Sequence, residues 1–89
     1  MVWKIRLEKP AEKAIAKLDY QTQKQIKNYL RNEVLLLDNP RFKGKGLTGK
    51  KKGLWRYRVN KYRIICRIEN DILTILVLQI AKRDVVYDD

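Results

Sequence analysis

The sequence contains no histidine and only one cysteine, Cys66, among its 89 residues. A lone cysteine cannot form an internal disulfide, which excludes a disulfide-stapled secreted scaffold and favours a reducing cytoplasm. Without histidine, zinc sites of the usual kind and catalysis by a pair of imidazoles are excluded. The acidic residues show no metal-ligand clustering, so we expect no metal ion and no other cofactor.

Long hydrophobic runs are missing as well. The longest apolar-rich segment, residues 72–81, is about half as long as a membrane-spanning helix needs to be. The first nine residues alternate charged and apolar side chains and contain no apolar signal core. We therefore expect a cytoplasmic protein that does not insert into a membrane.

No acidic residue occurs between residues 40 and 68, although this segment contains eleven of the 21 lysines and arginines. The rest of the chain carries ten basic and ten acidic residues, so the whole net charge of +11 arises in this one segment. Such a charge excess indicates a polyanionic partner. The length and the 45% hydrophobic content fit one small folded domain, which we expect to span residues 1–89.

Four segments have the composition and side-chain pattern of β-strands. They are residues 2–7, 54–59, 62–69 and 72–80. Two helical patterns follow the first strand: one starts at Pro10, and the other starts with Asp19 as its N-cap and ends before Pro40. Residues 41–53 hold all four glycines and are expected to form a loop, and residues 81–89 a turn of helix or a tail. The order β-α-α-β-β-β predicts an α+β fold, with a helical hairpin packed on one face of a mainly antiparallel four-stranded sheet.

The Asn60-Lys61 pair is typical of a two-residue hairpin turn, and it sets the register of the two middle strands. In this register the apolar side chains share the face that should meet the helices: Trp55, Tyr57, Val59, Tyr62, Ile64, Cys66 and Ile68. The arginines share the opposite face: Arg56, Arg58, Arg63 and Arg67. Like charges opposite each other destabilise a sheet by a few tenths to ~1 kcal/mol per pair. A solvated surface is one interpretation, but arginine binds phosphate oxygens in pairs, so this face is also a candidate anion site.

The glycine-rich loop contains two motifs that resemble nucleotide-binding loops. Residues 44–49 match G-x-G-x-x-G, and residues 44–50 nearly match the phosphate-binding G-x-x-x-x-G-K motif. Both motifs need a strand before them and a helix after them. Here a helix precedes and a strand follows, so a flexible basic loop that contacts a nucleic-acid backbone is the better interpretation.

The chain resembles the RelE/ParE superfamily of bacterial and archaeal toxins in its element order and in four short segments. These segments are AIAKLD at 14–19, LWRYRV at 54–59, KYRI at 61–64 and AKRDVVY at 81–87. RelE-like members are toxins of type II toxin–antitoxin systems that enter the ribosomal A site and cut mRNA without a metal, by attack of a ribose 2′-OH. The resemblance implies five catalytic residues: Arg56, Arg58, Arg63, Arg83 and Tyr87. It also implies that seven lysines contact RNA or the ribosome: Lys43, Lys45, Lys50, Lys51, Lys52, Lys61 and Lys82.

The resemblance further implies three partners: the ribosome, mRNA and a RelB-like antitoxin with an acidic or amphipathic segment. It implies no small-molecule cofactor. ParE-like members share the fold but inhibit DNA gyrase, and they generally lack the full basic-plus-tyrosine set, whose presence here favours the RelE-like branch. A gyrase inhibitor and a non-catalytic RNA-binding module are the alternatives. Some RelE proteins have lysines where this chain has Arg56 and Arg58, so the general base stays unassigned.

Overall fold

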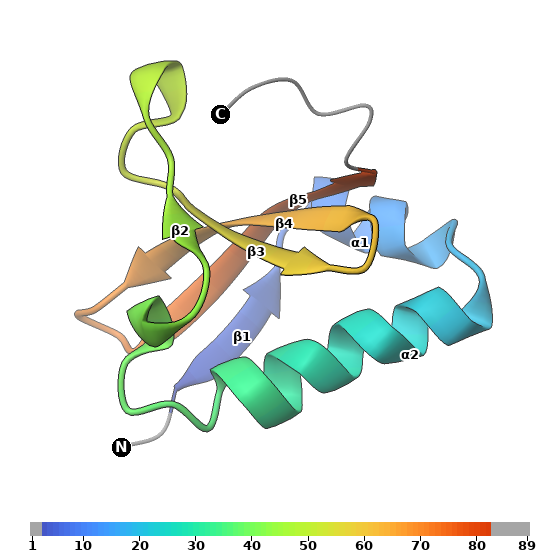
Figure 1. The fold of residues 1–89 in the computed structure, drawn as a ribbon, viewed down its shortest axis with the longest axis horizontal. Coiled ribbons are helices and arrows are strands. Elements are labelled where there is room, and N and C mark those ends of the chain that lie inside the picture. The colour runs from blue at the N-terminus through green and yellow to red at the C-terminus, as the bar shows by residue number, and fades with distance from the viewer. Residues whose placement is uncertain (1–2, 83–89) are drawn as a thin grey trace.

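The computed structural model describes residues 3–82 of the chain. Within this range, five strands form one mixed sheet in the order β1-β5-β4-β3-β2, and two helices pack against it (Figure 1). The strands are β1 (Lys4–Leu7), β2 (Lys45–Gly46), β3 (Trp55–Val59), β4 (Tyr62–Glu69) and β5 (Thr74–Lys82), and the helices are α1 (Lys9–Ala16) and α2 (Tyr20–Tyr29). The predicted α+β class and helical hairpin are confirmed.

The predicted number of strands is too low by one. β2 lies within the segment predicted as a loop and pairs antiparallel with β3, with Lys45 opposite Arg56 and Gly46 opposite Trp55. A strand of two residues is too short to show a periodic pattern, so the sequence does not reveal it. Because only the β1–β5 pair is parallel, the described sheet is mainly antiparallel, as predicted.

Asp19 caps α2 as predicted. Its carboxylate accepts hydrogen bonds from the Thr22 backbone N–H at 3.2 Å and from the Thr22 hydroxyl at 2.6 Å, and these bonds lower the pKa of Asp19. The regular part of the helix ends at Tyr29, earlier than predicted, and continues as a π-helical turn at Leu30–Val34. Leu30 and Val34, the first and last residues of this turn, have buried side chains, so the turn contributes to the hydrophobic core.

The register predicted for the central hairpin is confirmed. Arg58 lies opposite Arg63, and Tyr57 lies opposite Ile64. Asn60 has a φ of 59°, which the left-handed conformation of a tight hairpin turn requires. The next connection is longer than the predicted Asn70-Asp71 turn, because β4 ends at Glu69 and β5 begins at Thr74. β5 then continues to Lys82, so its last two residues are strand rather than the predicted turn of helix or tail.

A β-bulge in β5 keeps two of its side chains in the core. Ile65 pairs with Gln79, but the next residue, Cys66, pairs with Val77, so Leu78 has no direct partner on β4. Val77 and Ile80 are therefore both buried on the helix side, although strict alternation would turn one of them to the other face.

The core lies between the helices and the sheet. α1 contributes Ala11 and Ile15, α2 contributes Ile26, and the sheet contributes Tyr57 and Cys66 among others. The predicted burial of Cys66 is confirmed, and burial raises the pKa of its thiol. Among residues 3–82, no helix is long and apolar enough to cross a membrane.

Candidate functional site

Three of the predicted catalytic residues lie together on the sheet face that points away from the helices. Arg56 and Arg58 alternate along β3 with Tyr57, which is fully buried in the core, so their side chains point to the other side. Arg63 joins them from β4, directly opposite Arg58. Each of the three also has an interaction partner within the chain. Their position is as the register predicted, and their catalytic role stays a prediction.

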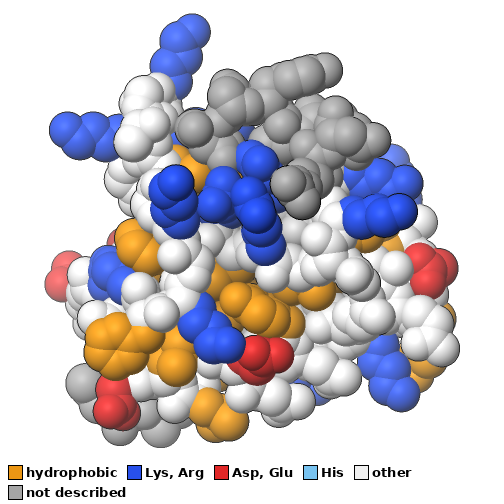
Figure 2. Space-filling model, in the orientation of Figure 1, with side chains coloured by type: hydrophobic (Ala, Val, Ile, Leu, Met, Phe, Trp, Pro, Cys, Tyr) orange, Lys and Arg blue, Asp and Glu red, His pale blue; other side chains and the backbone are white. Residues whose placement is uncertain are grey.

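A surface depression of about 330 Å³ lies where β2 and β3 meet the end of α2. Its lining consists of Tyr29, Gly44, Lys45, Arg56 and Arg58. Three of these five residues are cations and none is acidic. Lysine and arginine side chains gather over β2 and β3 on the face shown in Figure 2, whereas acidic side chains lie lower on the same face. The concave shape and the charge of one sign favour an anionic ligand.

Hydrogen bonds hold the loop wall of this depression against β3. The Trp55 indole N–H donates to the Lys43 carbonyl oxygen at 2.7 Å, and the Tyr57 hydroxyl donates to the Pro40 carbonyl oxygen at 2.6 Å. Gly44 has a φ of 83°, and a Cβ at this position would lie 2.4 Å from the Arg56 carbonyl oxygen. Only glycine fits at this position. The two hydrogen bonds and this close approach hold the loop wall in place through contacts within the protein.

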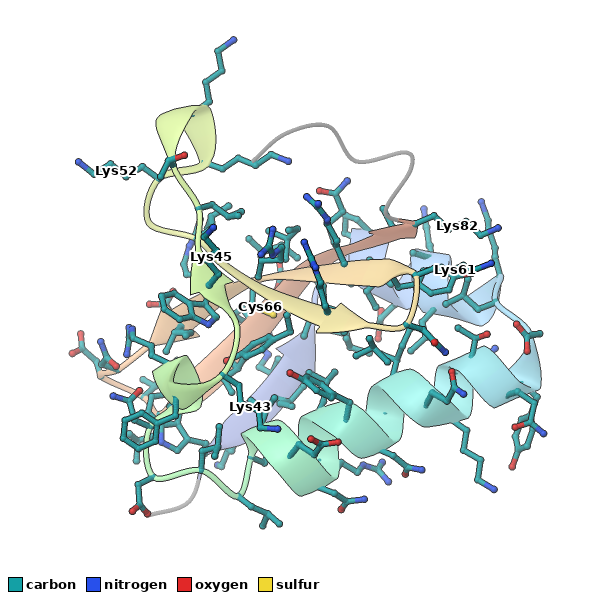
Figure 3. The ribbon with its side chains drawn as sticks, in the orientation of Figure 1. Lys43, Lys45, Lys52, Lys61, Cys66 and Lys82 are labelled. Carbon is teal, nitrogen blue, oxygen red and sulfur yellow. The ribbon has the colours of Figure 1, made fainter. Side chains whose placement is uncertain are left out.

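Lys43 is the predicted RNA-contacting lysine that forms an ion pair within residues 3–82. Its Nζ lies 2.8 Å from Oε1 of Glu33 and 5.8 Å from the centre of the Tyr29 ring. The hydrogen bond to Glu33 and the charge of that carboxylate raise the pKa of Lys43. The ion pair links the loop before β2 to the π-helical turn that follows α2, and Figure 3 shows Lys43 pointing toward this helical segment.

The remaining lysines do not form one continuous patch. Lys45 lies on β2, opposite Arg56 on β3. Lys52 lies at the tip of the loop, directly after the 3-10 turn Gly49–Lys51. Lys61 and Lys82 lie near each other at the opposite end of the sheet (Figure 3). Lys50 and Lys51 belong to the same 3-10 turn. The predicted RNA-binding set is therefore divided among the depression, the loop tip and the end of the β3–β4 hairpin.

Two predicted catalytic residues, Arg83 and Tyr87, lie outside the described residues. Within residues 3–82, no group of three or more histidine, cysteine, aspartate or glutamate side chains is placed to hold a metal ion.

Sequence reasoning missed Tyr29 and the close approach of Gly44. Tyr29 falls at helical spacing from Ile26 and next to Leu30 in the sequence, yet it is only partly buried and lines the depression. Its ring makes an edge contact with Tyr57, with ring centres 6.1 Å apart. Burial raises the pKa of the Tyr29 hydroxyl above its ordinary value. The polar tip of a tyrosine at a helix end is the one signal that could have separated it from the core leucines.

Known structures resemble this fold over almost its whole length. The toxin–antitoxin complex RelBE2 from Mycobacterium tuberculosis superposes with a TM-score of 0.84 and 20% identity, over 93% of this chain and 100% of the matched chain. A double arginine-to-alanine mutant of the E. coli toxin RelE in the free state superposes with a TM-score of 0.76 and 22% identity, over 96% of this chain and 87% of the matched chain. The same mutant in complex with an antitoxin RelBc peptide superposes with a TM-score of 0.73 and 19% identity, over 100% of this chain and 99% of the matched chain. At these identities the likeness establishes the fold.

The comparison with curated proteins gave no match. The comparison with protein families gave one that covers most of the chain: residues 5–87 match the family described as "ParE toxin of type II toxin-antitoxin system, parDE". With its RelE-like fold and its basic sheet face, the chain belongs to this toxin family, within the RelE/ParE superfamily.

Proposed function

We propose that this toxin is a ribosome-dependent mRNA endonuclease that acts in the cytoplasm as a single domain of residues 1–89, and so inhibits translation. The observation that carries the proposal is the gathering of Arg56, Arg58 and Arg63 on the helix-free face, beside Lys45. Like charges directly opposite each other cost stability, and an anionic ligand such as an RNA backbone compensates this cost.

The reaction needs no protein nucleophile. A ribose 2′-oxygen attacks the adjacent phosphorus, the P–O5′ bond breaks, and the products carry a 2′,3′-cyclic phosphate and a 5′-hydroxyl. A base takes the 2′-OH proton, and an acid returns a proton to the leaving 5′-oxygen. The arginines supply in-line positioning and stabilise the charge that develops on phosphorus, an effect worth roughly 2.7–4 kcal/mol for a well-placed donor.

Arginine stays protonated and is a poor base, so proton transfer falls to another group. Tyr87 and Arg83 are the residues that the family resemblance assigns to the substrate, and we propose that they complete the site. We propose that Lys50, Lys51, Lys52, Lys61 and Lys82 contact ribosomal RNA from the loop tip and the hairpin end.

We further propose a cognate antitoxin with an acidic or amphipathic segment that covers the basic face. Three of the solved structures that resemble this chain are RelE- or RelBE-type complexes of toxin with antitoxin, from M. tuberculosis, E. coli and Pyrococcus horikoshii. The net charge of +11 makes an acidic partner electrostatically favourable.

Gyrase inhibition is the second candidate, and one observation favours it. The matched family is described by its ParE toxins. The resemblance to the superfamily implies gyrase inhibition for ParE-like members. In that case the basic face would bind protein, and no RNA would be cut.

One experiment separates the two candidates. The chain is expressed without its antitoxin, the 5′ ends of mRNA on translating ribosomes are mapped, and plasmid supercoiling is measured in the same cells. Cleavage within the A-site codon with unchanged supercoiling is expected. Intact mRNA together with lost gyrase-dependent supercoiling would replace the endonuclease by the gyrase inhibitor.

Two variants make the test specific to the site. Arg63→Ala removes a predicted catalytic charge, and we expect at least a hundred-fold slower cleavage on ribosomes in vitro, as for the loss of one stabilising donor, roughly 10²–10³-fold. Lys52→Ala removes the same charge from the loop tip and should change ribosome affinity more than the cleavage rate. Equal effects of both variants on the rate would argue against a reaction centre at the arginines.

A further inference from the structure

We propose that the depression between α2 and β2–β3 is a nucleotide subsite, in which one base of a single-stranded RNA packs against the ring of Tyr29 and its phosphate binds Lys45, Arg56 and Arg58. The inference rests on the proposed function only in taking RNA as the ligand. It adds a base-contacting residue from α2, where neither the sequence nor the family resemblance placed one.

The lining of the depression matches the two parts of a nucleotide. Lys45 and Arg56 stand opposite each other on β2 and β3, and Arg58 follows two residues along the same strand, so the cations share one face. Tyr29, the last residue of α2, lines the same depression. Interleaved cations and an aromatic surface are the arrangement by which proteins hold single-stranded nucleic acid.

The size of the depression also fits. Its volume of about 330 Å³ lies at the lower end of the range of pockets for small ligands, roughly 300–1,000 Å³. This is more room than a phosphate group alone requires. A second hollow of about 340 Å³, between β1 and the helices, is lined by five aliphatic residues together with Glu12, Lys27 and Arg31 and has no aromatic ring. A third hollow of about 270 Å³ along α2 combines Tyr20 with lysines and an arginine, but none of the site arginines lines it.

The Tyr29 ring is held in place before RNA binds. The edge contact with Tyr57 supports it from the core, and the Lys43 ammonium lies 5.8 Å from its centre, fixed by the Glu33 ion pair. A ring that is already fixed loses little conformational freedom when a base packs against it, so binding costs less entropy than with a mobile side chain.

The test measures binding of a fluorescein-labelled ten-nucleotide RNA by anisotropy, over a range of salt concentrations. We expect Tyr29→Leu to weaken binding roughly ten-fold or more, since a base–aromatic contact is worth about 1–3 kcal/mol, and Tyr29→Phe to bind like the unmodified protein. The salt dependence should be unchanged in both variants because no charge is removed. Arg58→Ala, in contrast, should reduce the salt slope by about one.

An oligonucleotide of the same length without bases serves as the matched control. It should bind the unmodified protein and Tyr29→Leu equally, because the contact that the variant removes is absent. If Tyr29→Leu weakens the abasic oligonucleotide as much as the RNA, the effect is structural and the subsite is wrong. If an acidic peptide instead binds with an affinity that depends on Tyr29, and RNA does not, the depression belongs to a protein partner.

Cross-linking gives an answer that needs no variant to fold. RNA with 5-bromouridine, irradiated on the unmodified protein, should attach to the peptide that contains Tyr29, and attachment elsewhere only would overturn the subsite. Failure of the proposed function appears differently: Tyr29-dependent RNA binding would persist while ribosomal mRNA stays intact.

Discussion

The Tyr57 hydroxyl donates a hydrogen bond of 2.6 Å to the carbonyl oxygen of Pro40, and the Tyr57 side chain is fully buried. This bond joins β3, which carries two of the site arginines, to the loop that forms the wall of the depression. Burial also raises the pKa of Tyr57, which favours the protonated hydroxyl that donates this bond.

Tyr57→Phe should therefore destabilise the protein without changing its shape. The Pro40 carbonyl loses its side-chain donor in a buried place, which costs about 1–3 kcal/mol in the free energy of unfolding, measured by urea denaturation. Tyr20→Phe is the matched control, because Tyr20 is 72% exposed, and it should leave the free energy unchanged. Equal stability of both variants would contradict the role of the Tyr57 hydrogen bond.

Gly44→Ala should be much more damaging than Gly49→Ala. Both glycines have positive φ angles, 83° and 66°, so both substitutions carry the left-handed strain of about 1–2 kcal/mol. Only at Gly44 would the added Cβ also meet backbone, the carbonyl oxygen of Arg56, whereas nothing lies within 4 Å at Gly49. We expect a lower unfolding midpoint and weaker RNA binding for Gly44→Ala. Similar losses in the two variants would show that the close approach to β3 is unimportant.

Arg58→Gln should separate activity from stability. Arg58 lies directly opposite Arg63, so removing its charge relieves a repulsion of a few tenths to ~1 kcal/mol, which offsets the loss of the interaction that Arg58 makes within the chain. We expect unchanged or higher stability in urea, most clearly at low salt, together with at least ten-fold weaker toxicity in a growth assay. A variant that is both less stable and fully toxic would remove Arg58 from the site.

The Asp19 cap should make part of the stability depend on pH. Its pKa is lowered in the folded chain from the ordinary value of 3.8, so the carboxylate stabilises the fold above that value. This contribution is lost as the pH falls through the lowered pKa. Asp19→Asn keeps a capping oxygen but cannot titrate, so its unfolding midpoint should fall less steeply as the pH is lowered below about 4. Parallel curves for the two proteins would refute this role of Asp19.

Local patterns in the sequence determined the class of the fold and the composition of the basic face. The Asn60-Lys61 turn sets the register of the hairpin, and a period of two then divides its apolar side chains from Arg56, Arg58 and Arg63. The cap at Asp19 is equally local, because a carboxylate and an N–H three residues later are enough to form it.

The tertiary structure alone decided the fifth strand, the bulge in β5 and the depression. β2 is a strand only because it pairs with Trp55 and Arg56 of β3. The bulge at Leu78 allows both Val77 and Ile80 to pack in the core. Tyr29 and Lys45 are far apart in the sequence and line one hollow because the end of α2 and the start of β2 meet there. No local sequence pattern predicts this proximity, because it depends on how separate helices and strands pack against each other. Only this packing brings the basic residues and Tyr29 together in one site.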